Sequence, residues 1–287
     1  CDSHQLLTPS SGKYHTNPLN PGFCSLSMLA ARDASGTMRL RISNDRQYYV
    51  RDGYEQMWDI SEGRFLNETD GWKKISIWGM GIASRDITGD GRDEIVLTSM
   101  GDQLLQMAHK DGSYTNAPFT TGTYAHRPYF GDDGRPSTGW HAQFGDVDND
   151  GRADLFISKG NVDQMPSNAI HDPNNLLMQQ ANGTFNEAGL TAGVASGERS
   201  RGAALADFDL DGRLDILVSN RRAPMEIYRN ETQNTGHWIG VKLVQDGGNL
   251  NAIGARVTIG QDIQQVYIGG GHAGGQALPL HFGLGLS

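Results

Sequence analysis

An all-β fold is what this sequence predicts, and three observations lead to it. Glycine is abundant, at 38 of 287 residues, which favours many tight turns. Long stretches of helical periodicity are missing, and the apolar residues fall instead in short β-branched runs bounded by Gly, Asn and Asp. One such unit recurs along the chain at a spacing of about 60 residues. Short strands repeated at a fixed spacing are typical of the blades of a β-propeller.

The repeat is clearest in three segments of the chain. They read RDITGDGRDEIVLT (85–98), GDVDNDGRADLFIS (145–158) and ADFDLDGRLDILVS (206–219). Upstream, AARDASGTMRLRISN (30–44) aligns with them once about two residues are dropped, and it keeps only Asp33 and Ser35 of the polar loop positions. The sequence therefore predicts about four blades, the first of them degenerate, in a ring that this chain need not close by itself.

A second landmark follows each acidic segment, namely an aromatic residue after a glycine-containing turn. KDGSYTN supplies Tyr114 and ANGTFNE supplies Phe185. In the first copy, Trp58 of RDGYEQMWDIS is predicted to be the corresponding aromatic residue. The copies thus share two signals in the same order, as expected of one structural unit repeated along the chain.

The acidic segments carry the chemistry of a cation site. Alternate aspartates in a short loop repel one another unless a positive charge lies among them. Ca²⁺ takes roughly six to eight oxygen ligands, which side chains at loop positions 1, 3, 5 and 9 and a carbonyl at position 7 can supply. The sequence predicts about three Ca²⁺ ions, held by Asp86, Thr88, Asp90, Arg92 and Glu94; by Asp146, Asp148, Asp150, Arg152 and Asp154; and by Asp207, Asp209, Asp211, Arg213 and Asp215, each arginine through its carbonyl oxygen.

Two other interpretations of these loops are possible. An EF-hand loop begins in the same way, but it needs a glutamate at position 12 and an exiting helix. Position 12 is Leu97, Ile157 or Val218, each within a β-branched run, so the EF-hand is excluded. Turns without metal remain the alternative, because Asp and Gly also form good turns. Three loops with matching positions favour metal.

The copies are not expected to bind metal equally well. The Asp86 loop should be the weakest site, because Thr88 replaces a charged ligand. The shortened first copy at 31–39 should hold no ion, since Arg39 stands where the last acid is expected.

These residues resemble the FG-GAP/VCBS propeller repeat, whose blades carry D-x-D-x-D-G-x-x-D calcium loops. The C-terminal segment looks like the ASPIC/UnbV domain of cartilage acidic protein-like proteins, and the matching residues are His237-Trp238, NAIGARV at 251–257 and HFGLG at 281–285. The resemblance implies propeller blades over residues 23–232 and a small β domain over 233–287. That domain ends before the further strand that family members usually add.

The N-terminus and its cysteines allow two interpretations. Residues 1–22 are rich in Ser, Pro, Asn and Gly, and are predicted to be a flexible polar tether. Processing of bacterial lipoproteins leaves an acylated cysteine as the first residue, so Cys1 is a candidate lipid anchor, with Cys24 unpaired. The alternative is a disulfide between Cys1 and Cys24 that ties down the N-terminus.

Bulk composition limits the partners. A net charge of -9 argues against nucleic acid or an anionic membrane surface as the main partner. No apolar run approaches the roughly 18 residues of a membrane span. Gly269, Gly271 and Gly274 spell G-x-G-x-x-G, but no helix is expected after them, so they are predicted to form tight turns and not a nucleotide site.

The function predicted is that of a non-catalytic, calcium-stabilised, extracytoplasmic propeller that binds a protein or a glycan. A lipid anchor at Cys1 would make it an accessory subunit of a membrane complex, with contacts from the irregular loop at 159–174. The alternative is a polysaccharide lyase or hydrolase, which His and Tyr side chains converging on one pocket away from the acidic loops would favour. The candidate histidines are His109, His126, His141, His171, His272 and His281.

Overall fold

The computed structural model describes residues 4–45, 52–101, 103–124, 137–164, 170–275 and 279–286. Strands account for most of its regular structure, which confirms the all-β prediction. The two helices whose bounds lie within the described residues are single 3₁₀ turns, η1 (Glu68–Asp70) and η2 (Phe119–Thr121). No helix of this part of the chain is long and apolar enough to cross a bilayer.

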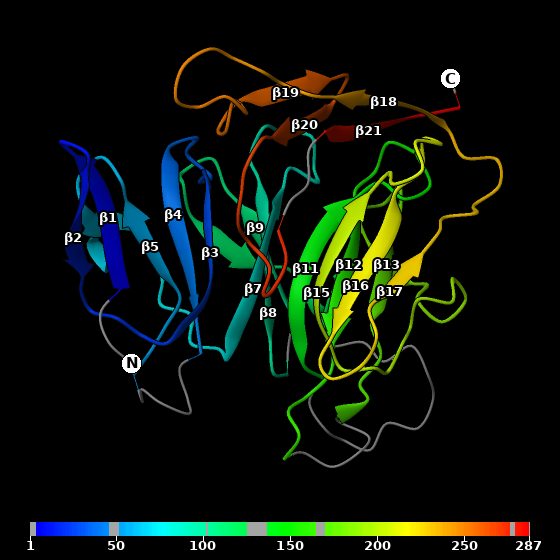
Figure 1. Cartoon of the computed structure of the whole chain (residues 1–287), viewed down its shortest axis with the longest axis horizontal. Helices are drawn as coiled ribbons and strands as arrows, with labels where there is room; N and C mark the ends of the chain where they lie inside the picture. Colours follow the sequence, from blue (N-terminus) through cyan, green and yellow to red (C-terminus); the bar gives the residue numbers. More distant parts are fainter. Residues whose placement is uncertain are drawn as a thin grey trace.

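Four antiparallel sheets, each a meander in chain order, form the blades (Figure 1). Blade 1 contains β3 (Ser25–Arg32), β4 (Met38–Asn44), β5 (Gln56–Asp59) and β6 (Arg64–Phe65), and blade 2 contains β7 (Gly79–Arg85), β8 (Glu94–Ser99), β9 (Leu104–Ala108) and β10 (Tyr114–Asn116). Blade 3 contains β11 (Gly139–Gly145), β12 (Asp154–Lys159), β13 (Asn175–Gln179) and β14 (Phe185–Glu187), and blade 4 contains β15 (Ser200–Ala206), β16 (Asp215–Asn220) and β17 (Glu226–Tyr228). The predicted four blades, including the degenerate first one, are confirmed.

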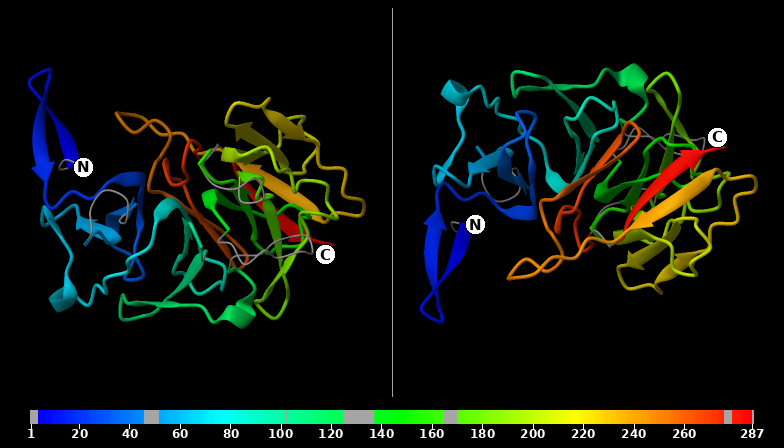
Figure 2. Two further views of the ribbon diagram at one scale, coloured as in Figure 1. Left: turned by 90° about the horizontal axis from the view of Figure 1, so that it is seen from below. Right: turned by 90° about the horizontal axis from the view of Figure 1, so that it is seen from above.

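The innermost strands β3, β7, β11 and β15 pack against one another in this order, so the blades follow an arc (Figure 2). An apolar core fills each space between neighbouring blades. Leu29 and Ile82 belong to the core of blades 1 and 2, Ala83 and Leu155 to that of blades 2 and 3, and Phe156 to that of blades 3 and 4. Within the described ranges the blades do not close into a ring.

The acidic loops connect the first two strands of blades 2, 3 and 4. Strand pairing ends at Arg85↔Glu94, Gly145↔Asp154 and Ala206↔Asp215, so each loop has the same eight residues' length. Loop positions 4 and 6 have left-handed backbone in every case, at Gly89, Asn149 and Leu210 and at Gly91, Gly151 and Gly212. A common backbone shape therefore follows from the common spacing of the repeat.

Blade 1 corrects two details of the sequence interpretation. Its pairing ends at Arg32↔Met38, which leaves a loop of only five residues and places Met38, not Arg39, at the position of the last acid. The aromatic residue after the glycine turn is Phe65 and not Trp58, because the turn that matches those of Tyr114 and Phe185 lies between β5 and β6. Trp58 instead packs edge-to-face on Phe65, with ring centroids 4.9 Å apart.

The N-terminal stretch forms a β-hairpin, so the prediction of a flexible tether is wrong for residues 4–19. Strands β1 (His4–Ser10) and β2 (Lys13–Leu19) are joined by Ser11 and Gly12, both with positive φ, which is the two-residue turn that suits a hairpin. Only His4 and Leu19 of its strands are buried. The hairpin is held to blade 1 through His4, whose Nε2 lies 3.1 Å from Gln56 Oε1.

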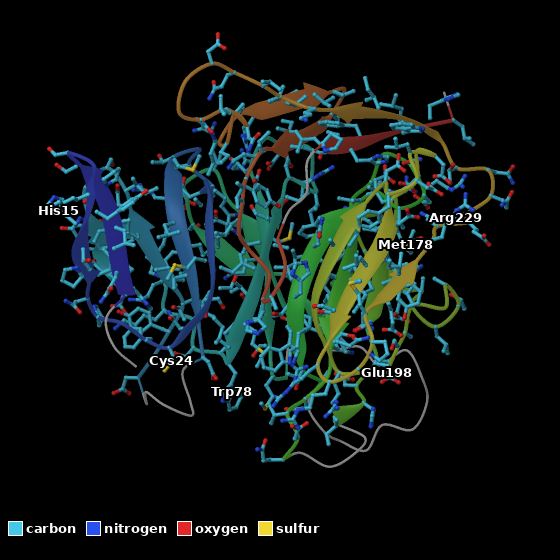
Figure 3. The ribbon with its side chains drawn as sticks, in the orientation of Figure 1. His15, Cys24, Trp78, Met178, Glu198 and Arg229 are labelled. Carbon is cyan, nitrogen blue, oxygen red and sulfur yellow. The ribbon has the colours of Figure 1, made fainter. Side chains whose placement is uncertain are left out.

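Cys24, just before β3 (Figure 3), is disulfide-bonded. This corrects the expectation that Cys24 stays unpaired. The chain has one other cysteine, Cys1, which lies outside the described residues. A disulfide requires a thiol that is not lipid-modified, so the finding favours the second interpretation of the cysteines over the anchor.

The C-terminal segment lies across the acidic ends of the blades (Figure 1). Strand β18 (His237–Val241) pairs with β21 (Leu280–Gly285), and β19 (Arg256–Ile259) pairs with β20 (Asp262–Gln265). After β20 the chain enters the space between the innermost strands. There Gly270 N donates to Met28 O and Gly271 N donates to Ile82 O.

The glycines of this axial segment are therefore required by close packing. A Cβ on Gly270 would lie 2.5 Å from Ile82 O, and one on Gly271 would lie 2.0 Å from His141 Nδ1. Gly269, Gly270 and Gly271 also have positive φ. The G-x-G-x-x-G stretch thus lets a backbone pass along the axis of the blades.

Candidate metal centre

The blade-3 loop brings three carboxylates together. Ligand oxygens of Asp146, Asp148 and Asp154 lie within 4.8 Å of one another. Backbone N–H groups fix two of them: Asp146 accepts from Gly151 N at 2.8 Å, and Asp154 Oδ2 accepts from Val147 N at 3.0 Å. Each carboxylate keeps further lone pairs, so the loop presents a preformed set of hard oxygen donors.

Electrostatics at this cluster favour a bound cation. Burial, followed by the charges of neighbouring aspartates, raises the pKa of Asp146 to about 7. Burial likewise raises the pKa of Asp154 to about 8. Carboxylates held this close ionise reluctantly without a positive partner, and a divalent ion would supply one. The donor set therefore fits Ca²⁺.

Blade 4 repeats the cluster in a more exposed form. Asp207, Asp209 and Asp215 have ligand oxygens within the same 4.8 Å of one another. Asp207 Oδ2 accepts from Gly212 N at 2.9 Å, which matches the turn of blade 3. Asp209 is exposed and also pairs with Arg229 at 2.7 Å, so the guanidinium group of Arg229 would compete with an ion for this carboxylate.

The fifth loop positions do not join these clusters. Asp90, Asp150 and Asp211 each accept a backbone bond from the arginine two residues later and bind its guanidinium. The arginines concerned are Arg92, Arg152 and Arg213. The arginine side chains thus close each turn through an ion pair. The sequence predicted a contribution only from the arginine carbonyl oxygens, as ligands of an ion.

Blade 2 brings together fewer acids. Asp86 accepts from Gly89 N and Gly91 N at 2.8 and 2.7 Å, and Glu94 accepts from Ile87 N at 3.1 Å. Thr88 is exposed. Among the described residues, only the blade-3 and blade-4 loops gather three acidic ligands. Two of the three predicted centres therefore appear as carboxylate clusters.

In blade 1 an arginine occupies the place of an ion. Arg39 Nε lies 3.0 Å from Asp33 Oδ2, and another of its nitrogens binds Asp59. Asp33 Oδ1 is saturated by Ser35 N at 2.9 Å and Thr37 N at 3.0 Å. The guanidinium group of Arg39 thus supplies the positive charge beside Asp33, the remaining acid of the degenerate loop.

The C-terminal segment covers the acidic loops, an arrangement that the sequence did not predict. Gly285 N donates to Asn149 O at 2.9 Å, and His281 Nε2 lies 2.7 Å from Asn149 Oδ1. The Asn149 side chain in turn donates to Gly212 O at 2.8 Å, which links the loops of blades 3 and 4. Asn149 is fully buried as a result. In the sequence, the only signal at this position is the residue type, because asparagine tolerates left-handed backbone.

Gly283 lies directly against the cluster. A Cβ at this position would be 1.9 Å from Asp146 Oδ2 and 2.6 Å from Asn149 Cα. On blade 2, Arg256 donates to Gly91 O at 2.8 Å and pairs with Asp93 at 2.6 Å. The same segment therefore contacts all three acidic loops, since Trp238 packs on Gly212 of blade 4.

Two cavities adjoin the clusters. One of about 360 Å³ is lined by Asp148, Asp150 and residues 232–236, and offers a path for an ion to the blade-3 loop. Another of about 510 Å³ lies between the blades and the C-terminal segment and includes Trp238, Tyr267 and His281.

The second cavity bears on the enzyme alternative, which a His and a Tyr around one pocket away from the acidic loops would favour. Asp207 lines the same cavity, so it does not meet that condition. His141 is fully buried against the axial glycines, and burial lowers its pKa to about 4, so it is neutral at pH 7. His126 lies outside the described residues.

The irregular loop at 159–174 is tied to blades 3 and 4 by charge. Buried Lys159 lies 3.4 Å from Asp172, and Asp163 pairs with Arg222 at 2.8 Å and with Arg199. Residues 165–169 of this loop lie outside the described ranges, so the predicted contact role of the whole loop stays a prediction.

Two known protein families match separate segments of this chain. The FG-GAP-like repeat matches residues 86–157 and 167–218, from the first aspartate of the blade-2 loop to β16. The ASPIC and UnbV family matches residues 245–287. The chain therefore contains FG-GAP-like repeats and a C-terminal match to the ASPIC and UnbV family. The match to the ASPIC and UnbV family includes β19, β20 and β21, which cover the acidic loops, whereas β18 precedes it.

Two curated relatives and one solved structure are similar to this chain. Cartilage acidic protein 1 of Mus musculus is 28% identical over 159 residues, which are 52% of this chain and 22% of the relative. The Homo sapiens protein of the same name is 42% identical over 57 residues, 20% of this chain and 9% of the relative. The chain thus spans less than a quarter of the length of either. The solved Dos1 propeller is 11% identical with a TM-score of 0.40, covering 94% of this chain and 69% of that chain.

Proposed function

We propose that this FG-GAP-repeat protein is a non-catalytic, extracytoplasmic binding module for a glycan or a protein, and that Ca²⁺ at the acidic loops stabilises it. The observation that carries the proposal is the pair of carboxylate clusters in blades 3 and 4, both covered by the C-terminal segment. A divalent ion at each cluster offsets most of the charge of its three carboxylates, and so stabilises the loop on which that segment rests. The ions are thus structural, and the blades serve as a rigid scaffold for recognition.

Two observations support a location outside the cytoplasm. Disulfides persist mainly in oxidising compartments, and Cys24 is disulfide-bonded. The carboxylate clusters also suit the millimolar Ca²⁺ of extracellular fluids. A lipid anchor at Cys1 is not part of this proposal, because the disulfide disfavours it.

Metal analysis after equilibrium dialysis tests the calcium role. We expect two ions bound tightly by the blade-3 and blade-4 loops, and a third more weakly at Asp86. At calcium 100-fold above Kd each tight site adds about 2.7 kcal/mol, so chelation with EGTA should lower Tm by about 10 °C or more. Asp146→Asn should remove one tight ion, and Asp111→Asn, in an acidic turn outside the loops, should remove none. An unchanged Tm in EGTA would falsify the calcium role.

Binding and catalysis are tested separately on the calcium-loaded protein. Pull-down from extracellular fractions and a glycan array should show saturable binding. Incubation with the bound glycan should release no new reducing ends, and turnover of the glycan would instead establish the lyase or hydrolase alternative.

A further inference from the structure

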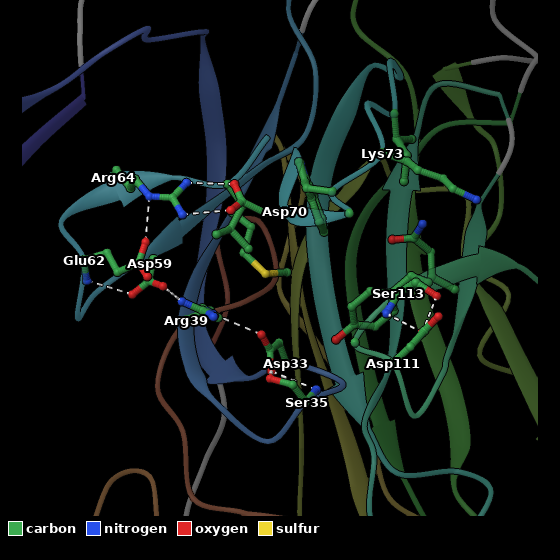
Figure 4. Close-up of a pocket in the computed structure, with 18 residues that line it drawn as sticks. Asp33, Ser35, Arg39, Asp59, Glu62, Arg64, Asp70, Lys73, Asp111 and Ser113 are labelled. Carbon is green, nitrogen blue, oxygen red and sulfur yellow. Dashed lines mark hydrogen bonds and ion pairs between the residues drawn. The ribbon is translucent and has the colours of Figure 1, made fainter. Parts of the chain in front are cut away.

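A cavity of about 360 Å³ lies between blades 1 and 2, at the end of the blades that carries the acidic loops (Figure 4). Blade 1 contributes Arg39 and Arg64 to one side, and the β9–β10 turn of blade 2 contributes Asp111 and Ser113 to the other. None of the residues that line it belongs to the predicted metal ligands. The cavity thus adjoins the degenerate loop of blade 1, which contributes Asp33 and Ser35 to its lining.

The charges of the blade-1 side are fixed in pairs. Arg64 Nη1 and Nη2 lie 2.7 and 2.8 Å from the two oxygens of Asp70, and its Nε lies 2.6 Å from Glu62. Arg39 bridges Asp33 and Asp59. Each guanidinium therefore shares its charge with two carboxylates, and donors and acceptors stand side by side in fixed positions.

The net charge of the cavity disfavours an anion. Its lining includes five acids (Asp33, Asp59, Glu62, Asp70 and Asp111) and three bases (Arg39, Arg64 and Lys73), which leaves a formal charge of -2. Anionic ligands are repelled by this excess, while hydroxyl groups can both donate to the carboxylates and accept from the guanidinium groups.

Two aromatic rings complete the cavity. Trp72 and Tyr114 line it, and both are largely buried. The guanidinium carbon of buried Arg41 lies 4.9 Å from the Trp72 ring centroid and 5.5 Å from that of Tyr114. Trp72 Nε1 also donates to Glu55 O at 3.2 Å. The rings are thus held rigidly before any ligand arrives, which lowers the entropic cost of binding.

We propose that this cavity binds one neutral sugar unit of a glycan. Fixed polar groups beside apolar and aromatic side chains are the usual lining of a small-molecule site, and the volume is near the lower end, roughly 300 Å³, of such sites. The hydroxyl groups of a sugar ring match the paired guanidinium and carboxylate groups, and its C–H faces match the rings. The proposal names the ligand class for the binding role above and rests on that role.

Titration of glucose, galactose, mannose and galacturonic acid into ¹⁵N-labelled, calcium-loaded protein tests it. At least one neutral sugar should shift the signals of residues 59–73 and 111–114 and of the Trp72 indole in a saturable way, and galacturonic acid should bind more weakly. Arg64→Ala should weaken binding roughly tenfold, the effect of losing a charge-assisted hydrogen bond. Arg222→Ala, an exposed ion-paired arginine of blade 4, is the matched control and should bind as the wild type does.

A second variant guards against a folding defect, because Arg64 also holds the turn around η1. Lys73→Ala leaves the ion pairs of Arg39 and Arg64 intact. It should weaken sugar binding several-fold, while the NMR signals of residues outside the cavity stay unchanged. Stronger binding of galacturonic acid than of galactose, or no saturable shift with any sugar, overturns the assignment. If glycan-array binding survives both variants unchanged, the cavity assignment fails while the binding role stands. If neither glycans nor proteins bind, the proposed function itself fails.

Discussion

Replacing Gly283 by alanine should separate the C-terminal segment from the acidic loop of blade 3. The added Cβ would lie 1.9 Å from Asp146 Oδ2 and 2.6 Å from Asn149 Cα, and a backbone atom cannot rotate away. Overpacking of this kind costs about 1–3 kcal/mol. Moving the strand also lengthens two hydrogen bonds to Asn149, from Gly285 N and from His281, at about 1 kcal/mol each. These costs add to about 3–5 kcal/mol, so the expected loss of unfolding free energy is at least about 3 kcal/mol.

Urea denaturation in calcium, with Tm as a second measure, provides the assay. Gly248→Ala is the control, because a Cβ there meets no atom within 4 Å and the backbone is not left-handed. We expect Gly283→Ala to unfold about 3 kcal/mol more easily than the control and to melt about 6 °C lower. Calcium analysis should show weaker binding at the blade-3 loop, since Asp146 must move. Equal stability of the two variants would refute the docking of this strand on the loop.

Two further predictions concern buried charges. Burial raises the pKa of Glu55 from 4.5 to about 7, so the folded protein keeps a proton that the unfolded chain releases, and stability falls as pH rises through this window. Between pH 4 and pH 8 the stability of Glu55→Gln relative to wild type should thus rise by about 3 kcal/mol in denaturant titrations, and a pH-independent difference would contradict the shift. Lys159→Met should cost about 3–5 kcal/mol, because Asp172, 3.4 Å from its ammonium group, is left charged in the interior. Adding Asp172→Asn should recover part of that loss, whereas strictly additive losses in the double-mutant cycle would show that the pair does not interact.

Much of the fold could be predicted from the sequence because a blade is a local unit. Asp86, Asp146 and Asp207 recur at nearly constant spacing, and each begins a loop between adjacent strands, so pattern and structure have the same short range. The β1–β2 hairpin was also within reach, since Ser11-Gly12 is a two-residue turn signal. The hairpin was not predicted because its strands are mostly polar. They are polar because little of the hairpin is buried.

The arrangement of the candidate site could be predicted only in part. Asp146 and Asp154 are eight residues apart, so their proximity follows from the loop. Asn149 and His281 are separated by 132 positions, and no local sequence pattern predicts their contact. The position-5 aspartates were expected to face an ion, but a neighbouring arginine competes for Asp150 from within the same turn. Such competition depends on side-chain geometry that spacing alone does not contain.

The axial glycine segment has a consequence for how this chain folds. Ser27 Oγ of β3 donates to Gly271 O across a separation of 244 residues, and Tyr267 donates to Ser84 O across 183. Contacts of such long sequence separation slow folding, because the connecting chain must lose its freedom before they form. The blades, whose pairings are local, should therefore form early and remain loosely associated until residues 266–275 enter the axis. The packing of the blades around this segment is thus expected to be completed late and slowly in folding, when residues 266–275 insert between β3, β7, β11 and β15.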